Sequence, residues 1–298
     1  MSRPSSGRIP AEPGRVVAAY GRRYRVELDD ATEIDCVTRG KKADVACGDR
    51  VQAARTGAGT GVIEQVAPRR TLFYRSNPRR QKLIAANVTR VVVVVAAKPP
   101  YSEDLVNRCV VGAEHAGIGA LIVLNKADLA EAEAASAALE LYRGLDYAVV
   151  ALSAKRDLSP LWPHLQGEVA VLVGQSGMGK STIINALVPH ASARVAEIST
   201  ALGTGRHTTT HAELYHLDEA THIIDSPGLQ EFGLNHLTVD DAARAFIEFR
   251  PFLGACRFRD CRHLTEPDCA ITAAGVEGRI SERRLASYRR LAAELERH

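Results

Sequence analysis

The sequence predicts a multidomain protein in which an N-terminal β-barrel precedes an α/β domain and a C-terminal α-helical, metal-binding domain. Three observations support this fold class. Short strands of two-residue periodicity fill residues 15–73, strands alternate with helices over 78–236, and three cysteines gather beside a histidine within 237–298. Residues 1–14 are rich in Ser, Pro, Gly and Arg, which predicts a disordered tail.

The barrel prediction depends on turn spacing. About five short strands separated by Gly and Asp turns indicate an OB-fold, which often binds oligonucleotides. Basic side chains on this segment could contact phosphates, and a solvated surface without a ligand is an equally supported alternative. These side chains are Arg22, Arg23, Arg25, Arg39, Lys41 and Lys42. Residues 69–80, which include Pro78, predict a basic linker to the next domain.

A mostly parallel sheet with helices on both faces is predicted for the central domain. Valines dominate residues 89–97, which is typical of a strand buried on both faces. Ser102 is expected to cap a helix that ends at His115. The remaining predicted elements are strands at 120–124, 147–152, 169–173, 213–217 and 221–224, with a helix at 129–142.

Residues 174–181 fit the phosphate-binding pattern G-x4-G-K-S between a predicted strand and a predicted helix. Glycines let the backbone wrap around phosphate oxygens, Lys180 can reach the β- and γ-phosphates, and Ser181 can ligate Mg²⁺. The expected nucleotide contacts here are Gly174, Gln175, Ser176, Gly177, Met178, Gly179, Lys180, Ser181 and Thr182.

Two further loops predict that the base is guanine. Asn125, Lys126, Ala127 and Asp128 fit N-K-x-D directly after a buried strand. The Asp128 carboxylate can accept from N1–H and the 2-amino group of guanine, whereas adenine offers neither donor. Ser153, Ala154 and Lys155 follow another strand, where the Ala154 amide is expected to donate to guanine O6. The predicted cofactors are therefore GTP or GDP with Mg²⁺.

The γ-phosphate is expected to contact two more motifs. Asp225 and Gly228 fit D-x-x-G, in which the carboxylate holds the Mg²⁺ shell and the glycine amide senses the phosphate. One threonine of residues 208–210 is expected to ligate Mg²⁺, with Thr209 preferred, although a solvated loop is the alternative. Leu229 occupies the position where Ras-like enzymes carry a water-orienting Gln. His207 is therefore a candidate catalytic residue, or else a residue that docks the loop or contacts RNA.

The order of these motifs indicates a circularly permuted GTPase domain. Ras-like proteins carry the P-loop before N-K-x-D, whereas here the guanine motifs come first. Joining the original termini of such a domain, and letting the chain leave it after Gly228, would keep the sheet unchanged, because domain termini commonly lie close together. The residues that follow Gly228 are then attached to a segment that moves on hydrolysis.

A structural zinc site is predicted near the C-terminus. Cys256, Cys261, His263 and Cys269 supply three thiolates and one imidazole, which suit tetrahedral Zn²⁺ without an open position. Residues 279–298 predict a helix with an apolar stripe. Its arginines 283, 290 and 297 could track rRNA phosphates or form a solvated face.

The permuted order, the loop at residues 205–210 and the C-terminal cysteines closely resemble the RsgA (YjeQ) family of small ribosomal subunit GTPases. The resemblance implies a GTPase of late subunit maturation that the subunit stimulates, with the subunit and its rRNA as partners. The rival hypothesis is a GTP-gated RNA-binding module whose hydrolysis is incidental.

Composition agrees with a monomeric cytoplasmic protein. The six cysteines form no secreted disulfide framework, and the net charge of +3 does not by itself indicate a nucleic-acid partner. The longest apolar run, residues 91–97, is far shorter than the ~20 residues of a membrane span, so no membrane partner is expected.

Overall fold

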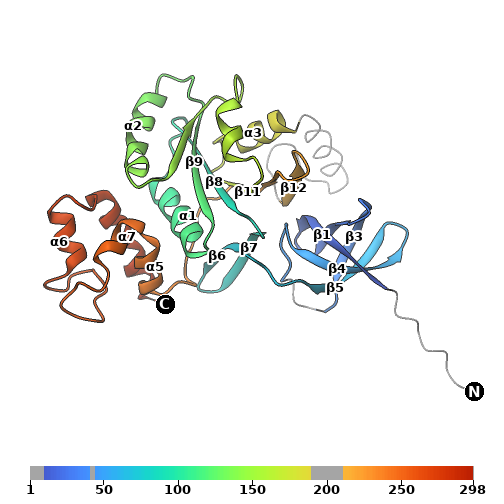
Figure 1. Cartoon of the computed structure of the whole chain (residues 1–298), viewed down its shortest axis with the longest axis horizontal. Helices are drawn as coiled ribbons and strands as arrows, with labels where there is room; N and C mark the ends of the chain where they lie inside the picture. Colours follow the sequence, from blue (N-terminus) through green and yellow to red (C-terminus); the bar gives the residue numbers. More distant parts are fainter. Residues whose placement is uncertain (1–9, 41–43, 189–210, 298) are drawn as a thin grey trace, which may run out of the picture.

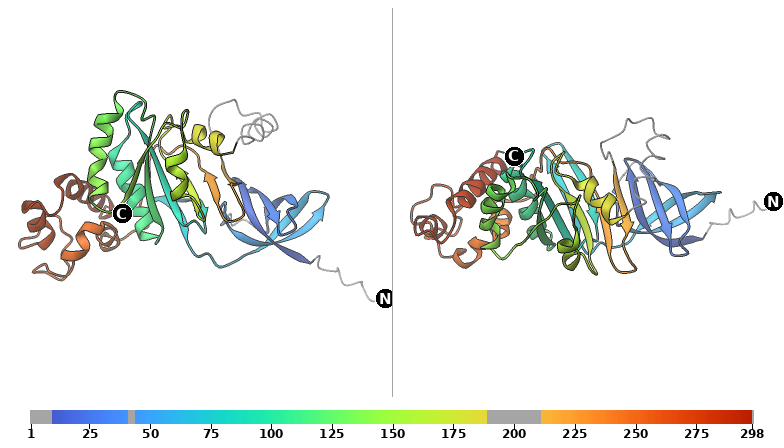
Figure 2. Two further views of the ribbon diagram at one scale, coloured as in Figure 1. Left: turned by 45° about the horizontal axis from the view of Figure 1, so that its top comes forward. Right: turned by 90° about the horizontal axis from the view of Figure 1, so that it is seen from above.

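The computed structural model describes residues 10–40, 44–188 and 211–297 and forms an elongated molecule of three parts in a row (Figure 1). The barrel and the C-terminal helices lie at opposite ends of the α/β domain, and two rotated views show the same arrangement (Figure 2). His207, Thr209, Lys41, Lys42 and residues 1–9 of the predicted tail lie outside the described residues. No helix in the described parts has the length and apolar character needed to cross a bilayer.

The five-stranded barrel is confirmed. Its strands are β1 (Ala11–Tyr20), β2 (Arg23–Leu28), β3 (Glu33–Thr38), β4 (Arg50–Gly57) and β5 (Thr60–Val66). They pair in the order β1-β2-β3-β5-β4, and β4 pairs back onto β1, which closes the barrel. Alternate residues of these strands point inward, so that Val16, Tyr24, Val26 and Ile34 form its core.

The central sheet has the order β10-β9-β8-β11-β13-β12. Its strands are β8 (Arg90–Ala96), β9 (Gly119–Asn125), β10 (Ala148–Ala151), β11 (Val169–Val173), β12 (Ala212–His216) and β13 (His222–Asp225). All neighbouring pairs are parallel except β12 with β13. Its helices are α1 (Glu103–His115), α2 (Ala132–Arg143) and α3 (Lys180–Leu187), with a short 3-10 helix η1 (Ser159–His164). Ser102 caps α1 as predicted, since its Oγ accepts from the Leu105 amide at 3.3 Å.

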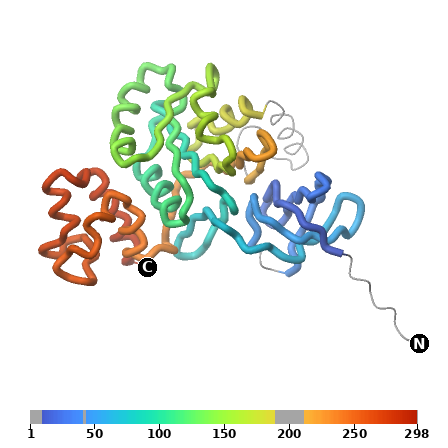
Figure 3. The backbone as a smooth tube through the Cα atoms, viewed as in Figure 1, coloured from blue at the N-terminus to red at the C-terminus, as the bar shows by residue number. Residues whose placement is uncertain are grey.

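The barrel and the central sheet are one continuous 11-stranded sheet, which the sequence did not predict. Strand β12 pairs antiparallel with β1, so that Ala18 faces Glu213 and Ala19 faces Ala212. The backbone trace in Figure 3 shows these two strands, far apart in sequence, running beside each other.

The predicted basic linker is wrong over most of its length. Residues Leu72–Asn77 form β6 and Arg80–Ala86 form β7, an antiparallel hairpin whose turn contains Pro78. Phe73 is buried and stacks on Phe232 at 5.1 Å between ring centroids, so the hairpin contributes to the core. The sequence predicts a linker here because the segment has several arginines and Pro78, which are common in exposed connecting segments.

The C-terminal module contains more helices than predicted. They are α5 (Val239–Ala245), η2 (Ile247–Phe252), α6 (Ala270–Val276) and α7 (Glu282–Leu295). In the predicted stripe of α7, Leu285, Tyr288 and Leu291 are buried. Arg283 pairs with Glu103 at 2.6 Å, and Arg290 lies 3.9 Å from Asp104, so both oppose acids at the start of α1.

Candidate guanine-nucleotide site and metal centre

The phosphate loop curls tightly between β11 and α3. Gly174, Gly177 and Gly179 have φ values of +146°, +82° and +94°, which side chains other than glycine rarely adopt. A Cβ on Gly174 would lie 2.3 Å from the Val94 carbonyl oxygen, so the loop also requires glycine for space. The backbone therefore has the curvature that a phosphate cradle needs.

Lys180 is held inside this loop. Its side chain is 7% exposed, and Nζ donates to the carbonyl oxygens of Gly174 at 2.8 Å and Gln175 at 3.1 Å. Burial lowers the pKa of Lys180, while the Asp225 carboxylate opposes that shift. The ammonium lies where an anionic ligand would offset its desolvation.

Asn125 joins three loops that are distant in sequence. Its Nδ2 donates to the Met178 carbonyl at 2.9 Å, and its Oδ1 accepts from the amides of Lys126 at 2.8 Å and Ala154 at 3.0 Å. The predicted guanine loops therefore meet the phosphate loop at one buried amide side chain. In this structure the Ala154 amide, the expected donor to guanine O6, donates to Asn125.

The base-binding side chains border the same loops. Lys126 Nζ donates to the carbonyls of Lys98 at 2.7 Å and Gly177 at 2.8 Å, so its stem bridges to the phosphate loop. A hydrogen bond from Ser153 lowers the pKa of Asp128, and Arg156 lies 3.6 Å from that carboxylate. Asp128 is therefore an ionised acceptor, as recognition of the two guanine donors requires.

The D-x-x-G segment lies against the phosphate loop. Asp225 ends β13 and is 6% exposed, and the Leu229 amide donates to the Gly174 carbonyl at 3.0 Å. A Cβ on Gly228 would lie 3.5 Å from Ser176 Cα and 3.6 Å from Lys180 Nζ. The Leu229 side chain is 4% exposed and apolar, so it cannot orient water.

The four candidate metal ligands form one cluster. The ligand atoms of Cys256, Cys261, His263 and Cys269 all lie within 4.8 Å of one another. His263 Nδ1 is 3.4 Å from the sulfurs of Cys256 and Cys269, which are 3.9 Å apart. A Zn–S bond of about 2.3 Å gives tetrahedral edges of about 3.8 Å, so the donor set fits zinc.

Comparison with known proteins then identifies the family. The model of the RsgA GTPase family matches residues 66–235. The chain belongs to the RsgA GTPase family. A relative named small ribosomal subunit biogenesis GTPase RsgA, from Nitrosospira multiformis, is 52% identical over 99% of this chain and 95% of its own length.

Two solved structures resemble the whole chain. YjeQ from Thermotoga maritima has a TM-score of 0.73 and 30% identity, covering 97% of this chain and 99% of its own. YloQ, described as a circularly permuted GTPase, has a TM-score of 0.69 and 26% identity, covering 99% and 98%. The predicted family, GTPase activity and circular permutation are thereby confirmed. In this chain the strands β9 and β10 that lead into the guanine loops precede the phosphate-loop strand β11.

Arg284 is the principal residue that sequence reasoning missed in this RsgA protein. It is fully buried and pairs with Glu248 at 2.6 Å, and it also donates to Asn107 Oδ1 at 2.6 Å on helix α1. Its guanidinium lies 4.4 Å from the centre of the Phe246 ring. The sequence feature that could have revealed its burial is its spacing, since Arg284 lies four residues before Tyr288 and therefore on the apolar side of α7.

Two of the predicted RNA contacts on the barrel already have acidic partners. Arg25 lies 3.5 Å from Asp35 and 3.8 Å from Glu33, and Arg39 lies 2.9 Å from Glu64. Arg22 in the β1–β2 turn and Arg23 at the start of β2 are exposed, and neither has an ion pair within the described residues. Among the described barrel residues, this turn is the stronger candidate for contact with phosphates.

Proposed function

We propose that this RsgA-family GTPase acts in late maturation of the small (30S) ribosomal subunit. It hydrolyses GTP to GDP and phosphate when the subunit stimulates it. The observation that carries the nucleotide assignment is the convergence of three motif loops on Asn125. The names of the relatives support the partner.

The nucleotide would lie across the loops that meet at Asn125. Asp128 accepts from the guanine, while Lys126 covers its plane and residues 153–155 close the base pocket. Amides of residues 174–182 and the Lys180 ammonium hold the phosphates, and Gly228 lies beside the γ-phosphate. Ser181, Thr209 and Asp225 are the proposed holders of Mg²⁺, which would neutralise developing phosphate charge.

The Cys3His cluster is proposed to hold one structural Zn²⁺. Four protein ligands leave no position for a substrate, and the short helices around the cluster bury a small core. The predicted limits of 15–73 and 78–236, after a tail of residues 1–14, are corrected, because β1 begins at Ala11 and the β6–β7 hairpin spans the second boundary. The proposed limits are 11–66 for the barrel, 72–236 for the GTPase domain and 237–298 for the zinc-binding domain. The protein is proposed to be a cytoplasmic monomer that contacts rRNA and no membrane.

The rate of GTP hydrolysis with and without purified small subunits tests the central proposal. Because Leu229 cannot orient water, we expect an intrinsic rate near or below that of an unassisted Ras-type site, on the order of 10⁻⁴ s⁻¹. Added subunits should raise it by at least about a hundredfold. A control with large subunits should leave the rate unchanged.

The buried Leu229 also favours a second candidate function, a GTP-gated RNA-binding module for which turnover is incidental. In that case small subunits would bind the GTP form more tightly than the GDP form, and they would not accelerate hydrolysis. Subunit binding without acceleration would therefore replace the first proposal by the second.

A further inference from the structure

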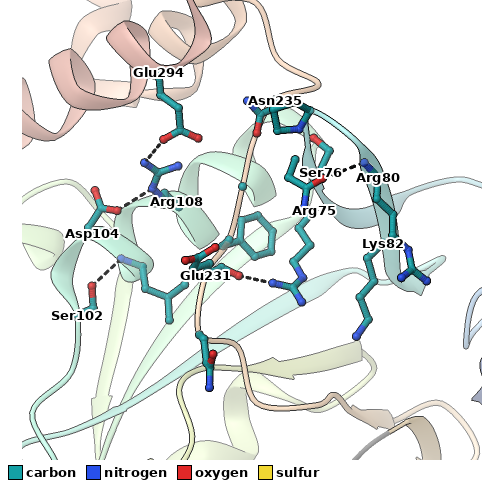
Figure 4. A pocket seen from close by; sticks show the side chains of 16 residues that line it. Arg75, Ser76, Arg80, Lys82, Ser102, Asp104, Arg108, Glu231, Asn235 and Glu294 are labelled. Carbon is teal, nitrogen blue, oxygen red and sulfur yellow. Dashed lines mark hydrogen bonds and ion pairs between the residues drawn. The ribbon is translucent and has the colours of Figure 1, made fainter. Parts of the chain in front are cut away.

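A cavity of about 670 Å³ lies between the β6–β7 hairpin, helix α1, residues 230–235 and the end of α7 (Figure 4). Its lining includes none of the residues assigned above to the nucleotide or to zinc. Its volume falls in the range of sites that take small molecules, including mononucleotides. The space is therefore large enough for a ligand of its own.

The hairpin wall of this cavity carries uncompensated positive charge. Arg75, Arg80 and Lys82 line it, and within the described residues none of the three forms an ion pair with a carboxylate. Burial and the nearby charges of Arg75 and Arg80 lower the pKa of Lys82. The cluster holds like charges close together, and a bound anion would relieve that repulsion.

The facing wall is already compensated. Arg108 lies between Asp104 at 2.7 Å and Glu294 at 2.6 Å, and Arg290 lies 3.9 Å from Asp104, so the charges of this wall balance. Figure 4 shows this chain of ion pairs on the opposite side of residues 230–235 from Arg75 and Lys82. The lining as a whole has four basic and three acidic side chains, Glu231 included, so its one excess positive charge comes from the hairpin.

We propose that this cavity is a second anion site, which binds a phosphate-bearing small molecule of about mononucleotide size through Arg75, Arg80 and Lys82. Guanidinium groups match phosphate oxygens with paired, charge-assisted hydrogen bonds, and lysine adds a point charge. The lining comes from four parts of the chain, and a cavity of this volume suits a small ligand.

The site adjoins the segment that follows the D-x-x-G motif of the proposed GTPase. Arg75 donates to the Glu231 carbonyl at 2.7 Å, and the Ser76 amide donates to the Gly233 carbonyl at 2.9 Å. The same segment begins at Leu229, whose amide is bonded to the phosphate loop. A ligand that holds residues 230–235 against the hairpin would change guanine-nucleotide affinity, and the effect would be reciprocal. This coupling rests on the proposed function, whereas the anion site does not.

Titration calorimetry of inorganic pyrophosphate into the full-length, GDP-saturated protein tests the site. We expect saturable binding of one equivalent, weakened at least about tenfold in the double variant Arg80→Gln/Lys82→Gln. Arg79→Gln is the control, because it removes one positive charge from the exposed turn of the same hairpin without lining the cavity. Absence of saturable millimolar binding, or equal losses in the control and the double variant, would overturn the proposal.

Two further measurements distinguish an anion site from a structural role of the same side chains and from a contact with RNA. Without ligand, Lys82→Gln should leave the melting temperature unchanged or raise it, because it relieves repulsion; a clear decrease would indicate a structural role instead. Binding of small-subunit rRNA should be the same in the double variant and the Arg79→Gln control. If rRNA binding falls in the double variant alone and pyrophosphate binding does not, the phosphate comes from RNA, and the small-molecule site is wrong.

Discussion

Asn125 supports the architecture of the nucleotide site, whereas Asp128 supports only recognition. Asn125→Ala would leave the Met178 carbonyl and the Ala154 amide without their partner. We expect a loss of about 2–4 kcal/mol in the free energy of unfolding, together with weaker GTP binding. Asp128→Ala is the matched variant in the same motif, and its exposed carboxylate should affect binding alone. Urea unfolding and calorimetry with GTP distinguish the two, and equal stability of both variants would contradict this division of roles.

His207 is the proposed residue that positions the attacking water, since Leu229 is apolar. His207→Ala should keep GTP binding within about twofold while removing most of the subunit-stimulated hydrolysis, by about a hundredfold. Calorimetry and stimulated turnover measure the two effects. Wild-type stimulated rates in this variant would exclude the catalytic role.

Two histidines make stability depend on pH. Burial, with Arg15 and His216 nearby, lowers the pKa of His222 to about 4. Burial and the nearby His115 lower the pKa of His236 to about 4 as well. The unfolded chain takes up these protons near pH 6.5, whereas the folded protein does so only near pH 4.

Stability should therefore fall as pH decreases from about 6.5 to about 4, by up to about 1.4 kcal/mol per unit for each histidine. Urea midpoints across this window measure the effect. His222→Gln should show a shallower slope than the wild type, and an identical slope would show that His222 does not contribute.

At the scale of elements, the packing of α7 against η2 and α1 depends on buried Arg284, which pairs with Glu248 of η2 and donates to Asn107 of α1. Arg284→Ala would leave Glu248 buried without its partner, and we expect a loss of about 3–5 kcal/mol. The double variant Arg284→Met/Glu248→Leu removes both charges and should recover most of that loss. Thermal unfolding of the two variants tests this prediction. Equal destabilisation would show that shape, and not charge, holds the helices.

The β6–β7 hairpin shows why an element can be missed. Its strands carry Arg80 and Lys82 at exposed positions and Arg75 at a half-buried one, and Pro78 lies in its turn. Locally this composition is typical of a linker. The hairpin is stable because Phe73 packs on Phe232 and Ser76 bridges to residues 233 and 234, which are contacts with a distant segment.

At the scale of the whole molecule, removal of zinc should act mainly on the C-terminal module. A chelator, or Cys269→Ser, should lower the melting temperature of this module because binding energy contributes to its folding. Atomic absorption should find one zinc per chain in the wild type and less in the variant. Guanine-nucleotide affinity should change little, because the C-terminal module lies on the other side of the α/β domain from α3, which follows the phosphate loop (Figure 1). If the melting temperature of the module stayed the same after zinc was removed, a structural role of the metal would be contradicted.

The continuous sheet gives the molecule a mechanical connection between its parts. Residues 205–210, with the proposed Thr209 ligand, directly precede β12, and β12 pairs with β1 of the barrel. A displacement at the start of β12 therefore acts on the barrel through hydrogen bonds, not through a linker. We therefore expect this pairing to be the route by which the nucleotide state could affect the barrel.

The sequence by itself determined the three-part architecture, the nucleotide motifs, their permuted order and the four candidate zinc ligands. These features depend on residue types at short spacings, which local backbone geometry converts directly into loops and strands. Only the tertiary structure decided that Asn125 engages the Ala154 amide, that Arg284 is buried against α1 and that β12 joins the barrel. Those contacts join segments that are distant along the chain, and local periodicity carries no information about which distant backbone groups will pair.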